Sequence, residues 1–117
     1  MIGKVTISPD VVREVARITT LATPGVLAMA ERPAGRNTVD PGVSVVVQAA
    51  APGEDASAGA NGKRTLQITL HVIAAADQPL QRLGQQIQSN VAGAIAEIAG
   101  MVVASVDVTF EDVRSQG

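Results

Sequence analysis

The last third of the sequence, residues 77–113, constrains the fold more than any other stretch. Apolar residues recur there at steps of three and four, which places them on one face of a helix. They are Leu80, Leu83, Ile87, Val91, Ala94 and Ile98. Gly100 is expected to end the helix, because glycine adopts the left-handed cap conformation at little cost. Alternation over residues 102–110 then predicts a strand whose dry face carries Val102, Ala104, Val106, Val108 and Phe110.

The N-terminal part predicts a short strand at residues 4–7 followed by a helix. Ser8 is a good cap for that helix, because its hydroxyl can accept a hydrogen bond from a free N–H group, and Pro9 is tolerated in the first turn. The spacing predicts an apolar face made of Val11, Val15, Ile18 and Ala22, with Val12 and Thr19 beside them, and a solvated face made of Arg13, Glu14 and Arg17. The Pro24-Gly25 pair should end the helix near Ala22.

The middle of the chain predicts strands separated by loops. Residues 26–30 suit a brief strand, residues 31–42 a loop rich in proline and glycine, and residues 43–48 a second strand. Residues 49–64 have no hydrophobic period and are rich in alanine and glycine, which predicts a flexible connection. A longer strand should follow at residues 65–74, with Leu66, Ile68, Leu70 and Val72 on its dry face.

These elements predict one domain over residues 1–117, of the α+β class. The simplest arrangement is a two-layer sandwich with the order strand-helix-strand-strand-helix-strand, without counting the brief strand at residues 26–30, in which both helices cover one face of a mixed sheet. The strands before and after the second helix should be parallel neighbours or near neighbours, joined by a right-handed crossover. The other face of the sheet should meet water or a partner.

Composition excludes several classes of function. The chain has no cysteine and one histidine, which excludes disulfides, thiol catalysis and metal sites built from several histidines. Its net charge of −2 offers no basic surface for nucleic acid. No stretch has the length of a membrane span or a signal peptide. We therefore expect a cytoplasmic protein without direct membrane insertion.

Few residues suggest chemistry. His71 could act as a general base oriented by Asp107, but a strand histidine between polar neighbours is more typical of a solvated sheet face. The acidic residues Asp107, Glu111 and Asp112 lack the spacing of a calcium loop. The sequence therefore predicts no catalytic, cofactor-binding or metal-binding residues.

Two polar surfaces are the candidate contact sites. The outer side of the second helix carries neutral amides, among them Gln81, Gln85 and Gln88. Such a face either packs against another chain, since amides lose hydration more cheaply than ions, or reflects compositional bias. The open sheet face offers Gln67, Thr69 and His71. The residues do not favour one surface over the other.

The sequence resembles the alkaline shock protein family of Gls-type general stress and envelope stress response proteins. The resemblance rests on an ordered set of segments: GKVTISPDVV at 3–12, PGV at 24–26, TLHVI at 69–73, QQIQSNV at 85–91, GMV at 100–102 and VDVTFEDV at 106–113. It implies a non-enzymatic bacterial protein of cell-envelope homeostasis. It further implies a homo-oligomer, held at the inner face of the membrane by a separate anchoring protein, with no catalytic residues or cofactor.

We therefore predict a structural or interaction protein that self-associates and docks to an envelope partner. The alternative is a small-molecule-binding regulatory domain with a ferredoxin-like sandwich, which rests on analogy between folds.

Overall fold

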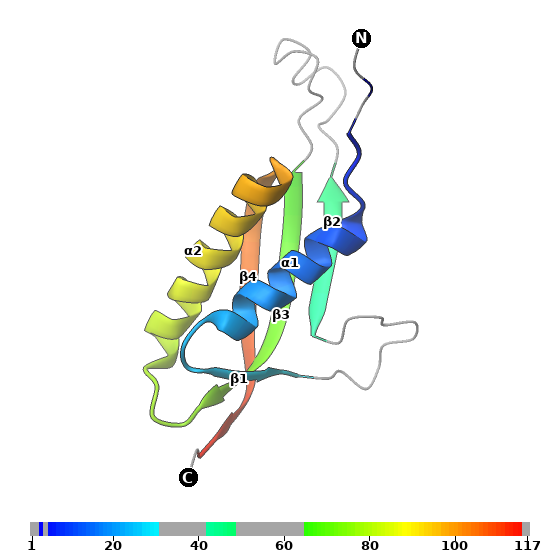
Figure 1. Cartoon of the computed structure of the whole chain (residues 1–117). Coiled ribbons are helices and arrows are strands. Elements are labelled where there is room, and N and C mark those ends of the chain that lie inside the picture. The colour runs from blue at the N-terminus through cyan, green and yellow to red at the C-terminus, as the bar shows by residue number, and fades with distance from the viewer. Residues whose placement is uncertain (1–2, 4, 31–41, 49–64, 116–117) are drawn as a thin grey trace.

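The computed structural model describes residues 3, 5–30, 42–48 and 65–115. Its elements are α1 (Pro9–Ala22), β1 (Val26–Met29), β2 (Val43–Gln48), β3 (Thr65–Ala75), α2 (Leu80–Ala99) and β4 (Val102–Arg114). Both helices lie on the same face of one sheet, so these elements form two layers (Figure 1). The predicted α+β sandwich with two helices on one face is confirmed. The connections expected at 31–41 and 49–64 lie outside the described residues.

β3 is the central strand of this mixed sheet. β4 runs parallel to it along its whole length, from the pair Thr65–Val102 to the pair Ala75–Arg114. On its opposite edge β3 pairs with two antiparallel strands in succession, β2 over residues 65–70 and β1 over residues 72–74. The predicted parallel pairing of the strands that flank the second helix is therefore confirmed.

Gly42 lets β1 and β2 share that edge. The N–H of Ala30 donates to the carbonyl of His71, and the N–H of His71 donates to the carbonyl of Gly42, both at 2.8 Å. Gly42 has φ +83°, and a Cβ there would lie 2.8 Å from the Ala30 carbonyl oxygen and 2.9 Å from that of His71. A side chain is excluded by both the backbone conformation and the space.

The core lies between β3 and the helices. Leu66, Ile68, Leu70 and Val72 of β3 are fully buried, as predicted. From α2 the buried residues are Leu83, Ile87, Val91 and Ile95, and Gly100 ends the helix in the left-handed conformation at φ +67°. Ile98, which the spacing places in the same row, is 62% exposed. Its angular position on the helix matches that of the core residues, but in the last turn of α2 it is Ala99 that packs against the core.

The predicted strand at residues 4–7 is wrong for its described part. Residues 5–7 form no strand, and Val5 is 88% exposed. Both edges of β3 are occupied, by β4 on one side and by β1 and β2 on the other, and residues 5–7 pair with none of these strands. The chain becomes regular at α1, where the Ser8 hydroxyl accepts from the Asp10 N–H at 3.0 Å, in agreement with the predicted cap.

The predicted buried face of α1 is wrong at three of its four positions: Val11, Ile18 and Ala22 are exposed, whereas Val15 packs against the core. The helix ends at Ala22 as expected, but its buried residues are Val12, Ala16 and Thr20. These small side chains allow the helix to approach its neighbours closely, and the buried Thr20 hydroxyl is satisfied by donating to the Ala16 carbonyl at 2.7 Å. The centre of the buried side is therefore turned by about one position around the axis from the predicted one, toward Val12 and Ala16.

A bulge changes the alternation of β4. Leu66 pairs with Val103, but the next residue, Gln67, pairs with Ser105, so Ala104 is an extra residue in β4. One extra residue exchanges the two faces of a strand. Val102 and Ala104 are therefore exposed and Val103 packs against the core, contrary to the prediction, whereas Val106, Val108 and Phe110 face the core as predicted.

Candidate interaction surfaces

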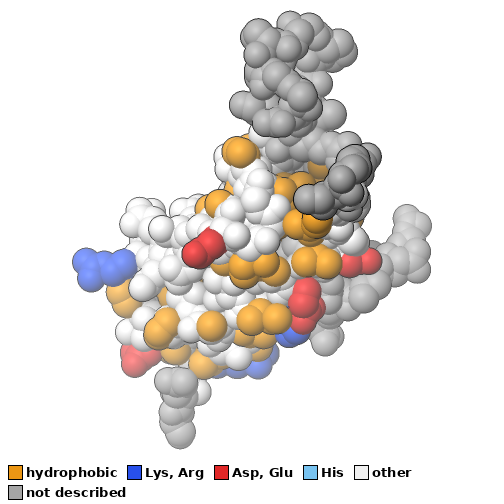
Figure 2. Space-filling model, turned by 45° about the horizontal axis from the view of Figure 1, so that its top comes forward, with side chains coloured by type: hydrophobic (Ala, Val, Ile, Leu, Met, Phe, Trp, Pro, Cys, Tyr) orange, Lys and Arg blue, Asp and Glu red, His pale blue; other side chains and the backbone are white. Residues whose placement is uncertain are grey.

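The outward side of α1 carries a row of exposed apolar side chains. Val11, Ile18 and Leu21 are 46%, 53% and 37% exposed, respectively. They recur at steps of seven and three, so they lie on one side of the helix, away from the buried Val12 and Ala16. We call these three residues the α1 stripe. Figure 2 shows several separate hydrophobic patches on one side of the molecule, with few charged side chains between them.

The charged residues beside the α1 stripe pair with each other. Arg13 bonds to Asp10, and Arg17 bonds to Glu14, one helical turn apart in each case. The hydrogen bond from the Arg17 guanidinium holds the pKa of Glu14 below that of a free glutamate. The predicted solvated charges therefore neutralise one another in pairs, and the stripe is bordered by no net charge from these four residues.

The open face of the sheet carries the predicted contact residues of β3. Gln67, Thr69 and His71 point away from the helices, and Asp107 and Thr109 of β4 lie beside them in register. None of the described elements covers this face, because both helices lie on the other one (Figure 1). The predicted residues of β3 therefore do share one accessible surface.

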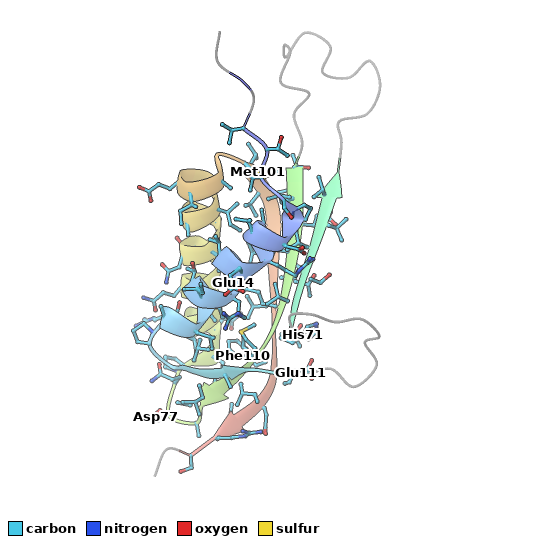
Figure 3. All side chains as sticks on the ribbon, turned by 45° about the vertical axis from the view of Figure 1, so that its right-hand side comes forward. Glu14, His71, Asp77, Met101, Phe110 and Glu111 are labelled. Atoms are coloured by element: carbon cyan, nitrogen blue, oxygen red, sulfur yellow. The ribbon has the colours of Figure 1, made fainter. Side chains whose placement is uncertain are left out.

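His71 contacts Glu111 rather than Asp107. The distance from His71 Nδ1 to a Glu111 carboxylate oxygen is 2.7 Å, and the two side chains lie next to each other in Figure 3. The register explains the correction: Asp107 pairs with Thr69, whereas Glu111 is the extra residue of a second bulge, between the pairs Val72–Phe110 and Ile73–Asp112. Within the described ranges no group of three or more His, Asp or Glu side chains could hold a metal ion.

A groove runs between α2 and β4. Its volume is about 510 Å³, and its lining residues are Leu80, Gln81, Gly84, Gln85, Gln88, Val108 and Phe110. We call it the α2–β4 groove. Gln88 closes one end by donating from Nε2 to the Val106 carbonyl at 2.9 Å. The predicted helix residues Gln81, Gln85 and Gln88 thus come together along one groove, in which no lining side chain is charged.

The sequence prediction therefore identified parts of two separate surfaces on opposite sides of the sheet. It missed the α1 stripe, because two of its residues were assigned to the core. One signal could have revealed it: α1 has apolar or small residues on two sides, at 11, 15 and 18 and at 12, 16 and 20. A helix that buries only one side needs no second apolar side.

The sequence matches the model of the alkaline shock protein family over residues 1–115. The chain belongs to this family. The family has a cell envelope-related function, and the resemblance to alkaline shock proteins is thereby confirmed. No helix in the described part of this alkaline shock family protein is long and apolar enough to cross a membrane.

Comparison with other proteins adds the following. No curated protein is significantly similar to the chain. Among solved structures, one variant of MamM CTD is 11% identical over 92% of this chain and 100% of that one, with a TM-score of 0.47. The nickel form of another variant is 12% identical over 90% and 98%, with a TM-score of 0.45. These similarities are too low to transfer any property of MamM to this chain.

Proposed function

We propose that this protein is a non-enzymatic interaction protein of the cell envelope, which self-associates and docks from the cytoplasm to a membrane-anchored partner. The observation that carries the proposal is the α1 stripe. Apolar side chains that contact neither the core nor a partner keep an unfavourable free energy of hydration. A row of them on one side of a helix is typical of a contact surface. The envelope-related function of the alkaline shock protein family gives the setting in which such contacts act.

The size of the stripe favours reversible self-association. Complete burial of a Val, Leu or Ile side chain contributes about 1.5–3 kcal/mol. The three stripe residues are about half exposed, so burial of the exposed half by a partner would contribute roughly half of that free energy for each residue. Two copies packed stripe to stripe would each contribute, and the paired charges of residues 10–17 would not repel each other. This supports an assembly that depends on protein concentration.

Docking to an anchored partner is supported by the two surfaces that the α1 stripe does not use. The open sheet face and the α2–β4 groove lie on different sides of the sheet. A copy that self-associates through α1 therefore keeps both available for a second protein. A membrane-anchored partner would explain an envelope function without a membrane-spanning helix in the described residues.

Light scattering with refractive-index detection tests the self-association, since the chain has no Trp or Tyr for absorbance. We expect the mass of the wild-type chain to rise with concentration. Ile18→Ser should shift this rise to at least about tenfold higher concentration, because a buried apolar contact is lost. Ile98→Ser is the matched control, since Ile98 is similarly exposed but lies on α2. A monomeric wild type, or equal effects of both variants, would contradict the proposal.

A small-molecule-binding regulatory role is a second candidate, and the observation in its favour is the α2–β4 groove. Its volume lies within the range of about 300–1,000 Å³ that is usual for ligand pockets. Its neutral, amide-rich wall would suit an uncharged polar effector. A thermal-shift screen with common metabolites tests this role: a stabilising compound whose effect disappears in Gln85→Ala would support it, and the absence of any such compound would count against it.

A further inference from the structure

β4 offers a free strand edge. Among the strands that the structure describes, β4 pairs with β3 alone. In a strand the main-chain groups of successive residues point to opposite edges. The Val106 carbonyl accepts from Gln88 of α2, so Val106 points away from β3. By alternation between the two bulges, Val108 and Phe110 also direct their N–H and C=O groups to the free edge.

The α2–β4 groove lies along this same edge. Val108 and Phe110 line it from the strand, and Gln81, Gln85 and Gln88 line it from the helix. The N-terminal half of α2 projects beyond β4 in the two views of Figures 1 and 3. The space beside the edge is therefore bounded by a row of unpaired main-chain groups and by a helix face, as in sites that bind a peptide as an added strand.

We propose that the α2–β4 groove binds an extended segment of another protein as an additional strand beside β4. The segment has alternating apolar and basic side chains, with the apolar ones facing α2 and the basic ones facing Asp107. The inference rests on the docking part of the proposed function and names the chemistry of its partner. The main-chain hydrogen bonds at Val108 and Phe110 supply affinity, since the Val106 carbonyl already accepts from Gln88, and the alternate side chains supply specificity.

The lining determines which side chains face α2. Leu80, Val108 and Phe110 offer apolar contact, and the surrounding amides carry no charge. A charged side chain placed there would lose hydration without an ionic partner. Small or branched apolar side chains therefore fit this side of the added strand.

The opposite side of the added strand would lie next to the open sheet face of β4. Asp107 and Thr109 are exposed there, and Glu111, which contacts His71, follows them. Neighbouring side chains of opposite charge on adjacent strands stabilise the pairing, and like charges oppose it. Lysine and arginine therefore suit this side.

A second copy of the chain fits this edge poorly. Antiparallel pairing of two β4 edges needs a two-fold axis perpendicular to the sheet, which puts both helix layers on the same side. The projecting half of each α2 would then lie over the other copy's β4, which its own α2 already covers. Parallel pairing of copies related by translation would place Asp107 beside Asp107 of the other copy and would not close into a dimer. A strand without its own helix layer avoids both conflicts.

The test uses the full chain labelled with ¹⁵N and the peptide acetyl-Lys-Val-Lys-Val-Lys-Val-Lys-amide. We expect amide shifts at Val106, Val108 and Phe110 that saturate below about 1 mM peptide. Replacing the central valine of the peptide by proline, or every lysine by glutamate, should weaken binding at least about tenfold. No saturable shift, shifts confined to other elements, or equal binding of the control peptides would overturn the inference.

Two variants of the protein separate the edge from the rest of the fold. Val108→Pro removes an outward N–H that makes no bond to β3 and should abolish peptide binding. Asp107→Lys changes an exposed side chain, leaves the edge intact and should weaken binding about fivefold or more at low salt, with unchanged thermal unfolding. If the peptide binds Asp107→Lys as it binds wild type, the charge complementarity is wrong and so is the inference.

Light scattering distinguishes this inference from self-association. Val108→Pro should keep the concentration-dependent mass of the wild type, because the α1 stripe lies elsewhere. If it instead becomes monomeric while remaining folded, the edge is the contact between copies and the inference is overturned. If the wild-type protein self-associates but does not bind the peptide, only this inference is contradicted. A monomeric wild type that binds the peptide removes only the proposed self-association.

Discussion

The two helices lie on the same face of the sheet but differ in what they present to solvent. α2 buries Leu83, Ile87 and Val91 and presents amides on its other side. α1 buries Val12, Ala16 and Thr20 and presents the apolar α1 stripe. Packing within this chain explains the inner side of both helices. Packing within the chain does not explain which residues α1 and α2 present to solvent. These two solvent-facing sides suit different contacts.

The exposed side of α1 is therefore suited to apolar contact, and that of α2 is suited to hydrogen bonding. The α1 stripe can gain stability only by leaving water, which is non-directional and tolerates several packing angles. The amides of α2 border main-chain groups of β4, where hydrogen bonds fix direction and register. This contrast is the reason why we propose self-association through α1 and recognition of a partner segment by α2 and β4.

The largest expected effect distinguishes the two sides of α2. Ile87→Ala should lower the free energy of unfolding by about 2–5 kcal/mol, because it leaves a cavity at a fully buried site. Gln85→Ala, two residues away on the exposed side, should change it by less than about 0.5 kcal/mol. Urea unfolding followed by far-UV circular dichroism measures both. Comparable losses would show that the amide side of α2 also supports the fold.

The next effect distinguishes the two sides of α1. Val12→Ala should cost about 1.5–3 kcal/mol, from the lost burial of two methyl groups and the cavity that remains. Val11→Ala, at the adjacent exposed position, should cost less than about 0.5 kcal/mol in dilute monomer. Guanidinium unfolding at low protein concentration measures the difference. If Val11→Ala were the more harmful change, the face predicted from periodicity would be the buried one after all.

A smaller effect compares two glycines of α2. Gly84→Ala and Gly93→Ala should each stabilise the helix by about 0.5–1 kcal/mol, because alanine loses less conformational entropy. A Cβ at Gly93 meets no atom within 4 Å, and one at Gly84 lies at ordinary contact distance, 3.5 Å from Phe110. Only Gly84→Ala should also weaken peptide binding, since Gly84 lines the α2–β4 groove. Thermal unfolding and the NMR titration check the pair, and a destabilised Gly84→Ala would contradict the groove geometry.

The smallest effect concerns the charges beside the α1 stripe. The pKa of Glu14 is lower in the folded chain than in the unfolded one, because Arg17 bonds to its carboxylate. Its contribution to stability is therefore present above the unfolded pKa and is lost as the pH falls through the folded pKa. Glu14→Gln should be slightly less stable than wild type at neutral pH and equal to it in acid. Thermal unfolding of both proteins from neutral to acid pH checks whether the difference in stability disappears as the pH falls.

The sequence predicted α2, β3 and the parallel pairing of β3 with β4 correctly, because these elements carry a clear hydrophobic period or a clear cap. It failed where apolar residues are too abundant to define a side. In α1 both possible faces contain valine, and the small size of Ala16 and Thr20 decides which one packs. In β4, residues 102–104 are all apolar, so the alternation hides the bulge at Ala104.

The candidate surfaces were predictable only in part, for a related reason. Local pattern identified Gln81, Gln85 and Gln88 as an unusual helix face. Whether a strand has a free edge depends on the pairing of the whole sheet, so the edge of β4 beside these amides could not be predicted. Likewise, the partner of His71 depends on a bulge at Glu111 that adds one residue to the register.

The most direct test of the α1 stripe as the contact between copies is cross-linking of single cysteines. The natural chain has no cysteine, so each variant carries one reactive thiol. Ile18→Cys lies in the stripe and Thr109→Cys lies on the open sheet face, and both positions are exposed. Treated with a short bismaleimide, Ile18→Cys should form a covalent dimer at least about tenfold faster than Thr109→Cys, because the stripes of two copies meet. Equal rates, or a faster reaction at Thr109→Cys, would contradict this account.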